Sequence, residues 1–238
     1  MTGKLYVVGV GPGDPERMTL KAARVLREVP CIFVPKGREE GSSLALSIVQ
    51  RTMSVEGKEI VELHFPMVKT APHPGPLPRG EREACSANDL DRKWNEAAAA
   101  IVSPLDRGKD AAFITIGDPG IYSTFFYIYD RLLELRPSLA IEIVPGISSI
   151  NAAAARAGLY LGLGNERIAI LPANYLDSLQ ETLERFDTVK DVLAKMGLTS
   201  KAAYVARAGM ADEKVFKDIR QVRAEDLNYF SLIVVRKR

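Results

Sequence analysis

The sequence predicts an α/β protein in two domains, and three observations lead to this prediction. Apolar runs at 5–10 and 111–116 have the composition of strands that are covered on both faces of a parallel sheet. Helical patterns separate such runs along the first part of the chain. After about residue 149 the strands become shorter and the helices more mixed in polarity. We therefore expect an α/β domain at 1–145 and a mixed α+β domain at 146–238, with the ligand cleft between them.

The length, charge and composition of the chain exclude several classes of protein. The chain has 238 residues, which is enough to bury a core without disulfides. Its net charge of +2 gives no basic field of the kind that nucleic-acid binding usually shows, so no nucleic-acid partner is expected. The two cysteines and two histidines have no ligand spacing, so we predict no metal site. Because the sequence has no signal-peptide pattern and no apolar run of membrane length, it predicts a cytoplasmic protein without a membrane partner.

The predicted elements of the first domain alternate along the chain. Strands are expected at 5–10, 31–34, 59–65, 111–116 and 140–144. The candidate residues at helix starts are Thr19, Ser42 or Ser43, and Asp89 or Asp91. Pro104 should kink or end the third helix near Ser103, and a fourth helix is expected at 124–135. The proline-rich stretch at 70–87 has no periodicity and should form a surface loop.

The second domain begins with a run of small residues. The alanines at 152–155 favour a helix that Gly158 ends in the preferred position for glycine. Further strands are expected at 167–171, 202–206, 213–219 and 230–235. Further helices are expected at 176–186 and 189–196.

Three glycine- and proline-rich turns follow predicted strands: the first turn (11–15), the second turn (117–120) and the third turn (145–149). Ligands of open α/β sheets bind outside the carboxyl ends of the strands, where such turns expose main-chain groups. We therefore expect a binding site here, against the alternative that the second turn is only a tight connection. The first turn fails the dinucleotide fingerprint, because Asp14 stands in place of its third glycine and Pro12 lies inside it.

Two cations, Lys36 and Arg38, lie just after the second predicted strand. Such residues can bind a carboxylate-bearing substrate. The alternative is that both are solvated surface charges.

Four segments of the chain resemble the tetrapyrrole methylases, which use S-adenosylmethionine. They are LYVVGVGPGDPERMTLKAARVL, FITIGDPGIYSTFFY, IEIVPGISSINAAAARAG and YFSLIVVRK, in the order of that family. The segments GDPGIYST, FVPKG, SSLALSIV and LHFPM resemble its branch that methylates C20 of precorrin-2 or of cobalt-factor II. The resemblance implies the two-domain tetrapyrrole methylase fold, a homodimer, a small-molecule tetrapyrrole substrate and a place in cobalamin biosynthesis.

The resemblance also implies roles for individual residues. The implied contacts of S-adenosylmethionine are Pro12, Gly117, Asp118, Ile121, Ser123, Thr124, Ser148, Ser149 and Gly209. Tyr122 or Asp118 would accept the proton that leaves C20, unless both only stabilise the turn. Lys36, Arg38 and Arg207 are candidates to bind the carboxylates of the substrate.

The sequence departs from the family pattern in two places. The proline-rich stretch looks like an insertion, and after Phe186 the chain enters a helix where family members have an apolar strand. Three alternatives therefore stay open. They are a methylase of another corrin carbon, an RNA or protein methylase of the same superfamily, and a catalytically impaired protein that binds the cofactor or a tetrapyrrole.

Overall fold

The computed structural model describes residues 2–36, 43–65, 87–170, 179–228 and 230–236. The chain forms two compact units, unit 1 (Met1–Ile147) and unit 2 (Ser148–Arg238). Among the described residues, no helix combines the length and the apolar character needed to cross a membrane.

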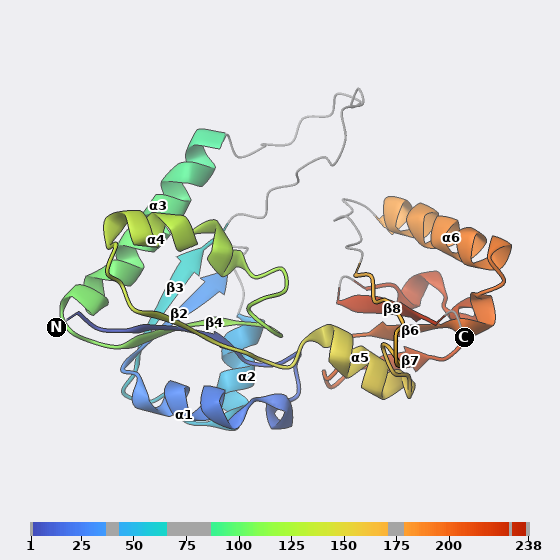
Figure 1. Ribbon diagram of the computed structural model, residues 1–238, viewed down its shortest axis with the longest axis horizontal. Helices are drawn as coiled ribbons and strands as arrows, with labels where there is room; N and C mark the ends of the chain where they lie inside the picture. Colours follow the sequence, from blue (N-terminus) through green and yellow to red (C-terminus); the bar gives the residue numbers. More distant parts are fainter. Residues whose placement is uncertain (1, 37–42, 66–86, 171–178, 229, 237–238) are drawn as a thin grey trace. The chain divides into compact units, whose positions relative to one another are not determined.

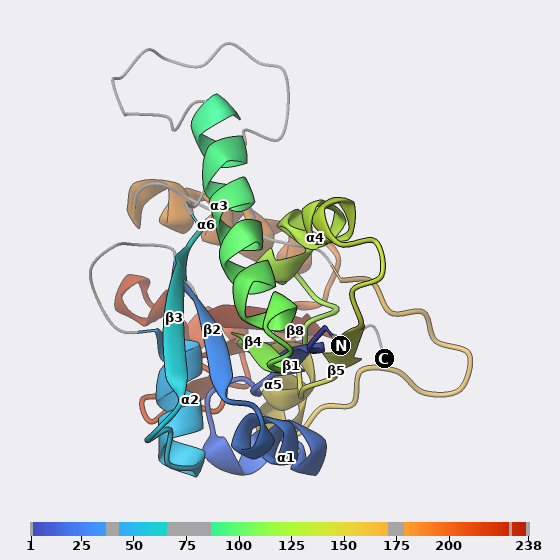
Figure 2. The same ribbon diagram turned by 90° about the vertical axis from the view of Figure 1, so that its left-hand side faces the viewer.

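The sheet of unit 1 (Figure 1) has parallel strands in the order β3-β2-β4-β1-β5, all of which are labelled in Figure 2. They are β1 (Leu5–Gly9), β2 (Cys31–Lys36), β3 (Glu59–His64), β4 (Ala111–Thr115) and β5 (Ile141–Val144). Every residue of β4 is buried, because helices cover both faces of the sheet. The five strands predicted for this part of the chain are confirmed, with small differences at their ends.

Helices pack on both faces of this sheet (Figure 2). They are α1 (Leu20–Glu28), α2 (Leu44–Thr52), α3 (Ala87–Asp106) and α4 (Tyr129–Leu135), with a 3₁₀ helix η1 (Pro15–Arg17) before α1. α1 and α2 cover the face that carries Val8 and Ile32. α3 and α4 cover the opposite face, which carries Val7 and Phe33. The chain therefore leaves β1 toward one face of the sheet and β4 toward the other.

The helix starts in unit 1 follow the predictions in part. The hydroxyl of Thr19 caps α1 and that of Ser43 caps α2, as expected. The third helix begins at Ala87, before either predicted aspartate and within the stretch predicted as a loop, of which 70–86 lies outside the described residues. The helix runs through Pro104 to Asp106, so Pro104 does not end it near Ser103. Because the helix ends two residues after the proline, the lost N–H affects only its last turn.

The expected helix at 124–135 is also wrong in its first part. Residues Thr124–Tyr127 form a 3₁₀ helix, η2, and α4 starts only after Ile128. The hydroxyl of Ser123 accepts the N–H of Phe125 at 3.3 Å. This short-range bond favours a tighter turn than an α-helix allows.

A carboxylate on β5 ties that strand to its neighbours. Glu142 forms ion pairs with Lys4, at 2.5 Å, and with Lys21 of α1. Hydrogen bonds from Lys21 and then from Lys4 lower the pKa of Glu142 to about 2. The charged form of this carboxyl is therefore the one that the folded state favours.

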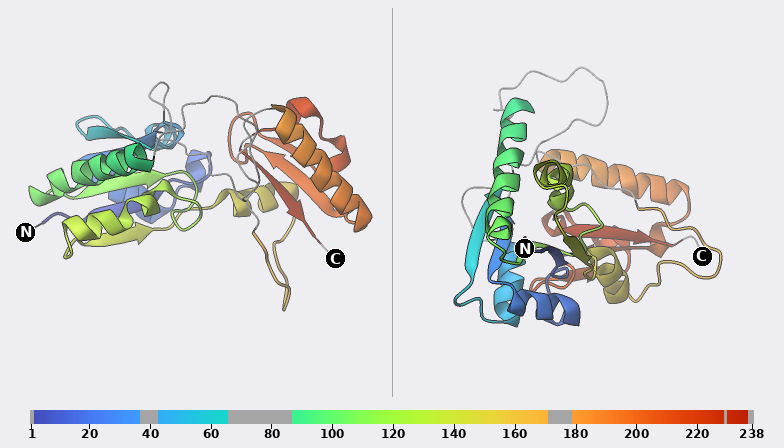
Figure 3. Two further views of the ribbon diagram at one scale, coloured as in Figure 1. Left: turned by 90° about the horizontal axis from the view of Figure 1, so that it is seen from above. Right: turned by 60° about the vertical axis from the view of Figure 1, so that its left-hand side comes forward.

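Unit 2 has an antiparallel sheet in the order β7-β6-β8, with a helix on each face (Figure 3). Its elements are α5 (Ser149–Ala157), α6 (Leu179–Lys195), β6 (Ala202–Ala206), β7 (Lys214–Phe216) and β8 (Ser231–Val235). Its 3₁₀ helices are η3 (Thr199–Lys201), η4 (Ile219–Gln221) and η5 (Ala224–Asp226). Gly158 ends α5 with a φ of 70°, as predicted.

Three predictions for unit 2 are wrong. Residues 167–170 form no strand, and Leu171 lies outside the described residues. Two separate helices were expected where α6 is continuous. An ion pair between Asp187 and Lys190, at 3.1 Å, lies within α6 where the break was expected. The strand expected at 213–219 is limited to β7, because Asp218 caps η4.

Candidate functional site

The three predicted turns meet at the carboxyl ends of the unit 1 strands. Gly117 donates its N–H to the carbonyl of Gly11 at 2.8 Å, and Gly11 donates to the carbonyl of Gly117 at 3.3 Å. The first and second turns are therefore joined main chain to main chain. This bridge follows the parallel β1–β4 ladder, which ends where Gly9 lies opposite Thr115, but it is an isolated antiparallel pairing.

The third turn lies equally close to the second turn and to the end of β1, and glycines permit this approach. A Cβ on Gly146 would lie 2.1 Å from the carbonyl oxygen of Gly117 and 2.9 Å from the carbonyl carbon of Gly9. A Cβ on Gly9 would lie 2.5 Å from the same oxygen. Because these neighbours are main chain, no side-chain rotation can relieve such contacts. Only glycine therefore fits at 9 and 146.

The side chain of Asp118 joins the second turn to the third. Its Oδ1 accepts the N–H of Gly120 at 2.8 Å, and its Oδ2 accepts the N–H of Gly146 at 2.9 Å. A carboxylate that accepts two N–H groups forms charge-assisted hydrogen bonds. Asp118 therefore holds the two turns in one arrangement.

Further side chains support the turns from α1 and α2. Arg51 of α2 donates from its guanidinium to the carbonyl of Gly13, and the hydroxyl of Thr19 donates to the carbonyl of Pro145 at 3.4 Å. Arg17 lies 3.5 Å from the carboxylate of Asp14. The roles of Arg51 and Thr19 were missed in the sequence, because their partners are far away along the chain and no local pattern marks them.

The turns lie at a topological switch point. β1 and β4 are neighbours, and the chain leaves them toward opposite faces of the sheet, to α1 and to η2 and α4 (Figure 1). A crevice forms at such points and is where ligands of open α/β sheets bind.

Residues after the second turn differ in exposure. Tyr122 is 67% exposed and has a φ of 54°, which is uncommon for a residue other than glycine. Ser123 is buried and caps η2, and Thr124 is the first residue of η2. Pro12 is buried and Ile121 is partly exposed. Tyr122 therefore presents its side chain to solvent while its neighbours support the turn.

The candidate residues of unit 2 depend on their own local elements. The hydroxyl of Ser148 caps α5 by accepting the N–H of Asn151 at 3.3 Å, and Ser149 is the first residue of that helix. Arg207 follows β6 with a φ of 53° and forms an ion pair with Asp212. Gly209 donates its N–H to Glu213 at 2.7 Å.

The two cations expected on a loop after the second strand have different outcomes. Lys36 is instead the last residue of β2, its ammonium pairs with Glu62 at 2.8 Å, and its side chain is 13% exposed. Arg38 lies outside the described residues.

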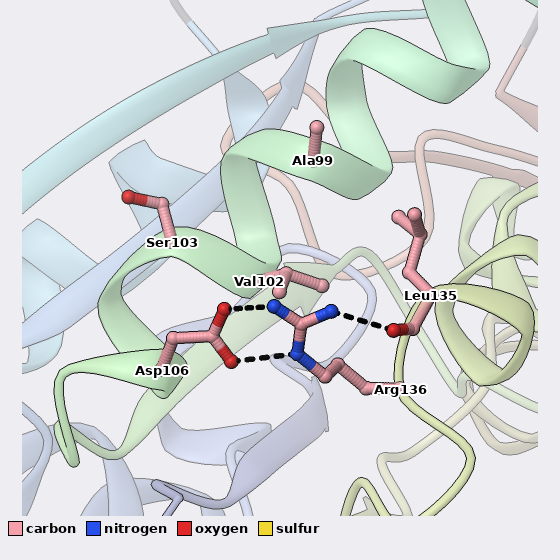
Figure 4. Close-up of a pocket in the computed structure, with 6 residues that line it drawn as sticks. All are labelled: Ala99, Val102, Ser103, Asp106, Leu135 and Arg136. Atoms are coloured by element: carbon pink, nitrogen blue, oxygen red, sulfur yellow. Dashed lines mark hydrogen bonds and ion pairs between the residues drawn. The ribbon is translucent and has the colours of Figure 1, made fainter.

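A hollow of about 460 Å³ between α3 and α4 is separate from these turns (Figure 4). Its lining residues are Ala99, Val102, Ser103, Asp106, Leu135 and Arg136. Hydrogen bonds from Arg136 engage Asp106 and lower the pKa of its carboxyl. Leu105 precedes Asp106 on α3, and its carbonyl accepts the N–H of Gly3, just before β1, at 2.7 Å. The hollow is therefore near the amino ends of the strands.

Comparison with known proteins identifies the family. A profile of the tetrapyrrole (corrin/porphyrin) methylases matches residues 4–222. The cobalt-precorrin-2 C(20)-methyltransferase of Salmonella typhimurium is 33% identical over 252 residues, which cover 100% of this chain and 98% of that protein. The probable cobalt-precorrin-2 C(20)-methyltransferase of Methanocaldococcus jannaschii is 35% identical, and the alignment covers 98% of this chain and 96% of that protein.

Solved structures agree at the level of the fold. A cobalt precorrin-4 methyltransferase has a TM-score of 0.64 at 19% identity, with 98% of this chain and 94% of that chain covered. The uroporphyrin-III C-methyl transferase of Thermus thermophilus, complexed with S-adenyl homocysteine, has a TM-score of 0.57 at 20% identity, with 98% and 92% covered. The expected fold and family are confirmed, and the chain belongs to the tetrapyrrole (corrin/porphyrin) methylases.

Proposed function

We propose that this protein is a methyltransferase that uses S-adenosylmethionine to methylate C20 of precorrin-2, or of its cobalt-bearing form, in cobalamin biosynthesis. The observation that supports this most is the similarity over nearly the whole chain to two relatives named as cobalt-precorrin-2 C(20)-methyltransferases. The meeting of three turns at the switch point of unit 1 supports a ligand site in the same chain.

The groups at the turns fit the proposed cofactor. S-adenosylmethionine supplies a methyl group on a positively charged sulfur, and it also carries a carboxylate, an ammonium and an adenine. Such a ligand needs main-chain donors, carbonyls and small side chains, which the turns and the adjoining 3₁₀ helix contain. The residues that we propose to hold it are Pro12, Gly117, Asp118, Ile121, Ser123, Thr124, Ser148, Ser149 and Gly209.

Positioning is the main contribution that we assign to this chain. Methylation forms a carbon–carbon bond at C20, breaks the sulfur–methyl bond and releases a proton from C20. Holding the two reactants in contact lowers the barrier by about 7 to 11 kcal/mol in favourable cases. Asp118 acts in this scheme as a positioning residue, because both of its oxygens already accept main-chain N–H groups.

Tyr122 is the group that we propose to relay the proton. Its side chain is exposed beside the second turn, so its hydroxyl can exchange protons with water. Lys36 and Arg207 already have carboxylate partners, Glu62 and Asp212. We propose that each exchanges its partner for a carboxylate of the substrate, together with Arg38.

The test is an assay of the purified protein with S-adenosylmethionine and either metal-free or cobalt-bearing precorrin-2. Mass spectrometry should detect one added methyl group, and NMR should place it on C20. A methyl group on another ring carbon would instead identify a sister corrin methylase.

One observation favours a second candidate function. α6 runs without interruption through the position at which relatives of the family are expected to have a strand. A catalytically impaired protein that binds the cofactor or a tetrapyrrole would retain calorimetric binding of S-adenosylhomocysteine and give no methylated product with either ring form.

We also propose that the protein is a cytoplasmic homodimer. Light scattering coupled to size-exclusion chromatography should give twice the 26.1 kDa mass of the chain. A mass equal to one chain at working concentration would contradict this proposal.

A further inference from the structure

The loop between β6 and β7 carries two of the residues that we propose for binding, Arg207 and Gly209. The strand register pairs Ala206 with Lys214, so the loop spans residues 207–213. It is longer than the usual hairpin connection of roughly two to five residues. A connection of this length needs contacts of its own to keep a single conformation.

The main chain of this loop is tightly folded. Arg207 and Gly209 both have left-handed backbone conformations, with φ of 53° and 81°. The N–H of Met210 donates to the carbonyl of Arg207 at 2.9 Å, and the N–H of Glu213 donates to the carbonyl of Met210 at 3.2 Å. Because a left-handed conformation is unfavourable for arginine, the contacts around the loop must hold it in place.

The carboxylate of Glu213 supplies the central contact. Its side chain is only 9% exposed. Oε2 accepts the N–H of Gly209 at 2.7 Å, and Oε1 accepts the Nε–H of Arg156 on α5. Charge-assisted hydrogen bonds of this kind are stronger than those between neutral groups. Glu213 therefore fixes Gly209 relative to α5.

This arrangement is similar to that of Asp118 in unit 1. Both carboxylate oxygens of Asp118 accept main-chain N–H groups, those of Gly120 and Gly146. In Glu213 one oxygen binds the main chain and the other binds a guanidinium. In each unit a carboxylate thus holds a glycine in a turn or loop that carries proposed contacts of the cofactor.

Asp212, the neighbouring carboxylate in the loop, has a different environment. It pairs with Arg207, and the two side chains are 57% and 39% exposed. Exposed ion pairs contribute little to stability, because water screens them. This pair can therefore open when Arg207 meets a carboxylate of the substrate, whereas the better-buried carboxylate of Glu213 keeps its hydrogen bonds.

We propose that Glu213 is a positioning residue for the cofactor. It acts through Gly209, whose N–H it already engages, so that a ligand meets Gly209 at its carbonyl or its Cα. The inference rests on the proposed function, in which Gly209 contacts S-adenosylmethionine. Glu213 holds Gly209 in place for this contact while Arg207 exchanges its partner.

The test combines calorimetry with S-adenosylhomocysteine and steady-state kinetics of methyl transfer, both on the full chain. Glu213→Ala should weaken binding on the order of tenfold and raise the KM for S-adenosylmethionine to a similar extent. Its kcat should change less than about threefold, because no reacting group is lost. Glu213→Gln has one acceptor oxygen for two donors, so its affinity should lie between those of the parent protein and Glu213→Ala.

Two control variants separate positioning from general effects of charge and stability. Asp212→Asn removes the neighbouring charge and should change the affinity for S-adenosylhomocysteine by less than about twofold. Tyr204→Phe removes hydrogen bonds to the carbonyl of Asp226 and from the N–H of Asn228, both at 3.1 Å. It should lower the stability of unit 2, measured by urea unfolding, and keep the affinity of the parent protein.

Four results would overturn the proposal. They are parent-like affinity in both Glu213 variants, an equal loss of affinity in Asp212→Asn, an equal loss in Tyr204→Phe, and a fall in kcat with an unchanged KM. A parent protein that does not bind S-adenosylhomocysteine would instead contradict the proposed function, and this inference with it.

Discussion

Unit 1 and unit 2 hold their candidate binding residues in different ways. In unit 1 the candidate groups are mainly main chain, and the three turns are joined to one another by the Gly11–Gly117 bridge and by Asp118. In unit 2 each candidate depends on one local element, such as the N-terminus of α5 for Ser148 or the ion pair with Asp212 for Arg207.

This difference predicts how changes spread. A substitution in one turn of unit 1 should disturb all three turns, because their contacts are shared. A substitution in unit 2 should lower the free energy of unfolding only by the contribution of the helix cap or ion pair that it removes. The following variants test this contrast, in order of decreasing expected effect.

Gly146→Ala should have the largest effect. The new Cβ would lie 2.1 Å from the carbonyl oxygen of Gly117, so the main chain of two turns must move. We expect a loss of about 3 kcal/mol or more in the free energy of unfolding. The affinity for S-adenosylhomocysteine should fall roughly 100-fold. Urea unfolding and calorimetry measure the two quantities.

Gly57→Ala is the matched control in the same unit. Gly57 has a φ of 76° and nothing within 4 Å of an added Cβ. It should lose about 1 kcal/mol from backbone strain alone and keep its affinity for the ligand. Equal losses in the two variants would contradict the role of close approach at Gly146.

Asp118→Asn should have the next largest effect. The amide has one acceptor oxygen where the carboxylate uses two, so one of the N–H groups of Gly120 and Gly146 loses its partner. We expect a loss of about 1 to 3 kcal/mol in stability, with weaker binding of S-adenosylhomocysteine. Asp110→Asn is the control, because Asp110 accepts the N–H of Lys4 at an exposed position before β4. Unchanged ligand affinity in Asp118→Asn would show that the second and third turns do not depend on this carboxylate.

Arg51→Gln should reduce stability by about 1 kcal/mol, because it removes the hydrogen bond to the carbonyl of Gly13. The affinity for S-adenosylhomocysteine should also fall, since the first turn loses its support from α2. Arg24→Gln removes only an exposed pair with Glu28 on α1 and should be nearly neutral. If both variants bind the ligand equally well, Arg51 does not position the first turn.

Ser148→Ala tests the local character of unit 2. It removes the cap of α5 and should cost about 1 kcal/mol, as should Ser43→Ala at the start of α2 in unit 1. Thermal unfolding compares the two. A loss of ligand affinity in Ser148→Ala alone would support the proposed contact of Ser148 with the cofactor.

Glu142→Gln should have the smallest effect, and one that depends on pH. The pKa of Glu142 is lowered to about 2, below its ordinary value of 4.5, by Lys21 and then Lys4. The carboxylate therefore stabilises the folded state above pH 4.5, and this contribution disappears as pH falls toward 2. Urea midpoints of parent and variant should differ at pH 7 and converge near pH 2. A constant difference across this range would assign the effect to packing.

The sequence predicted much of unit 1, because a strand buried on both faces must be almost wholly apolar. The segment around Phe113 was recognised for this reason. The partners of the turns were not predictable. Asp118 and Gly146 are 28 residues apart, and Arg51 and Gly13 are 38 residues apart. Contacts of this kind follow from strand order, which no local pattern contains.

Predictions were weaker in unit 2, where the local patterns were ambiguous. Ile168 and Ile170 alternate with Arg167 and Ala169 as in a strand, yet both isoleucines are about half exposed, at 58% and 49%. An alternating segment forms a strand only where a neighbouring strand is available to pair with it. The continuous α6 was missed because Asp187 and Thr188 have low helix propensity, which tertiary packing of Phe186 on Tyr204 overrides.

The near-contact of Gly9, Gly117 and Gly146 limits how this protein can diverge. No residue other than glycine fits at positions 9 and 146. Sequence variation among descendants of this chain must therefore leave these two glycines unchanged. Exposed residues beside the turns that have no proposed role in the reaction are not restricted in this way. Directed evolution toward new ring substrates should therefore randomise exposed residues around the three turns and keep these glycines.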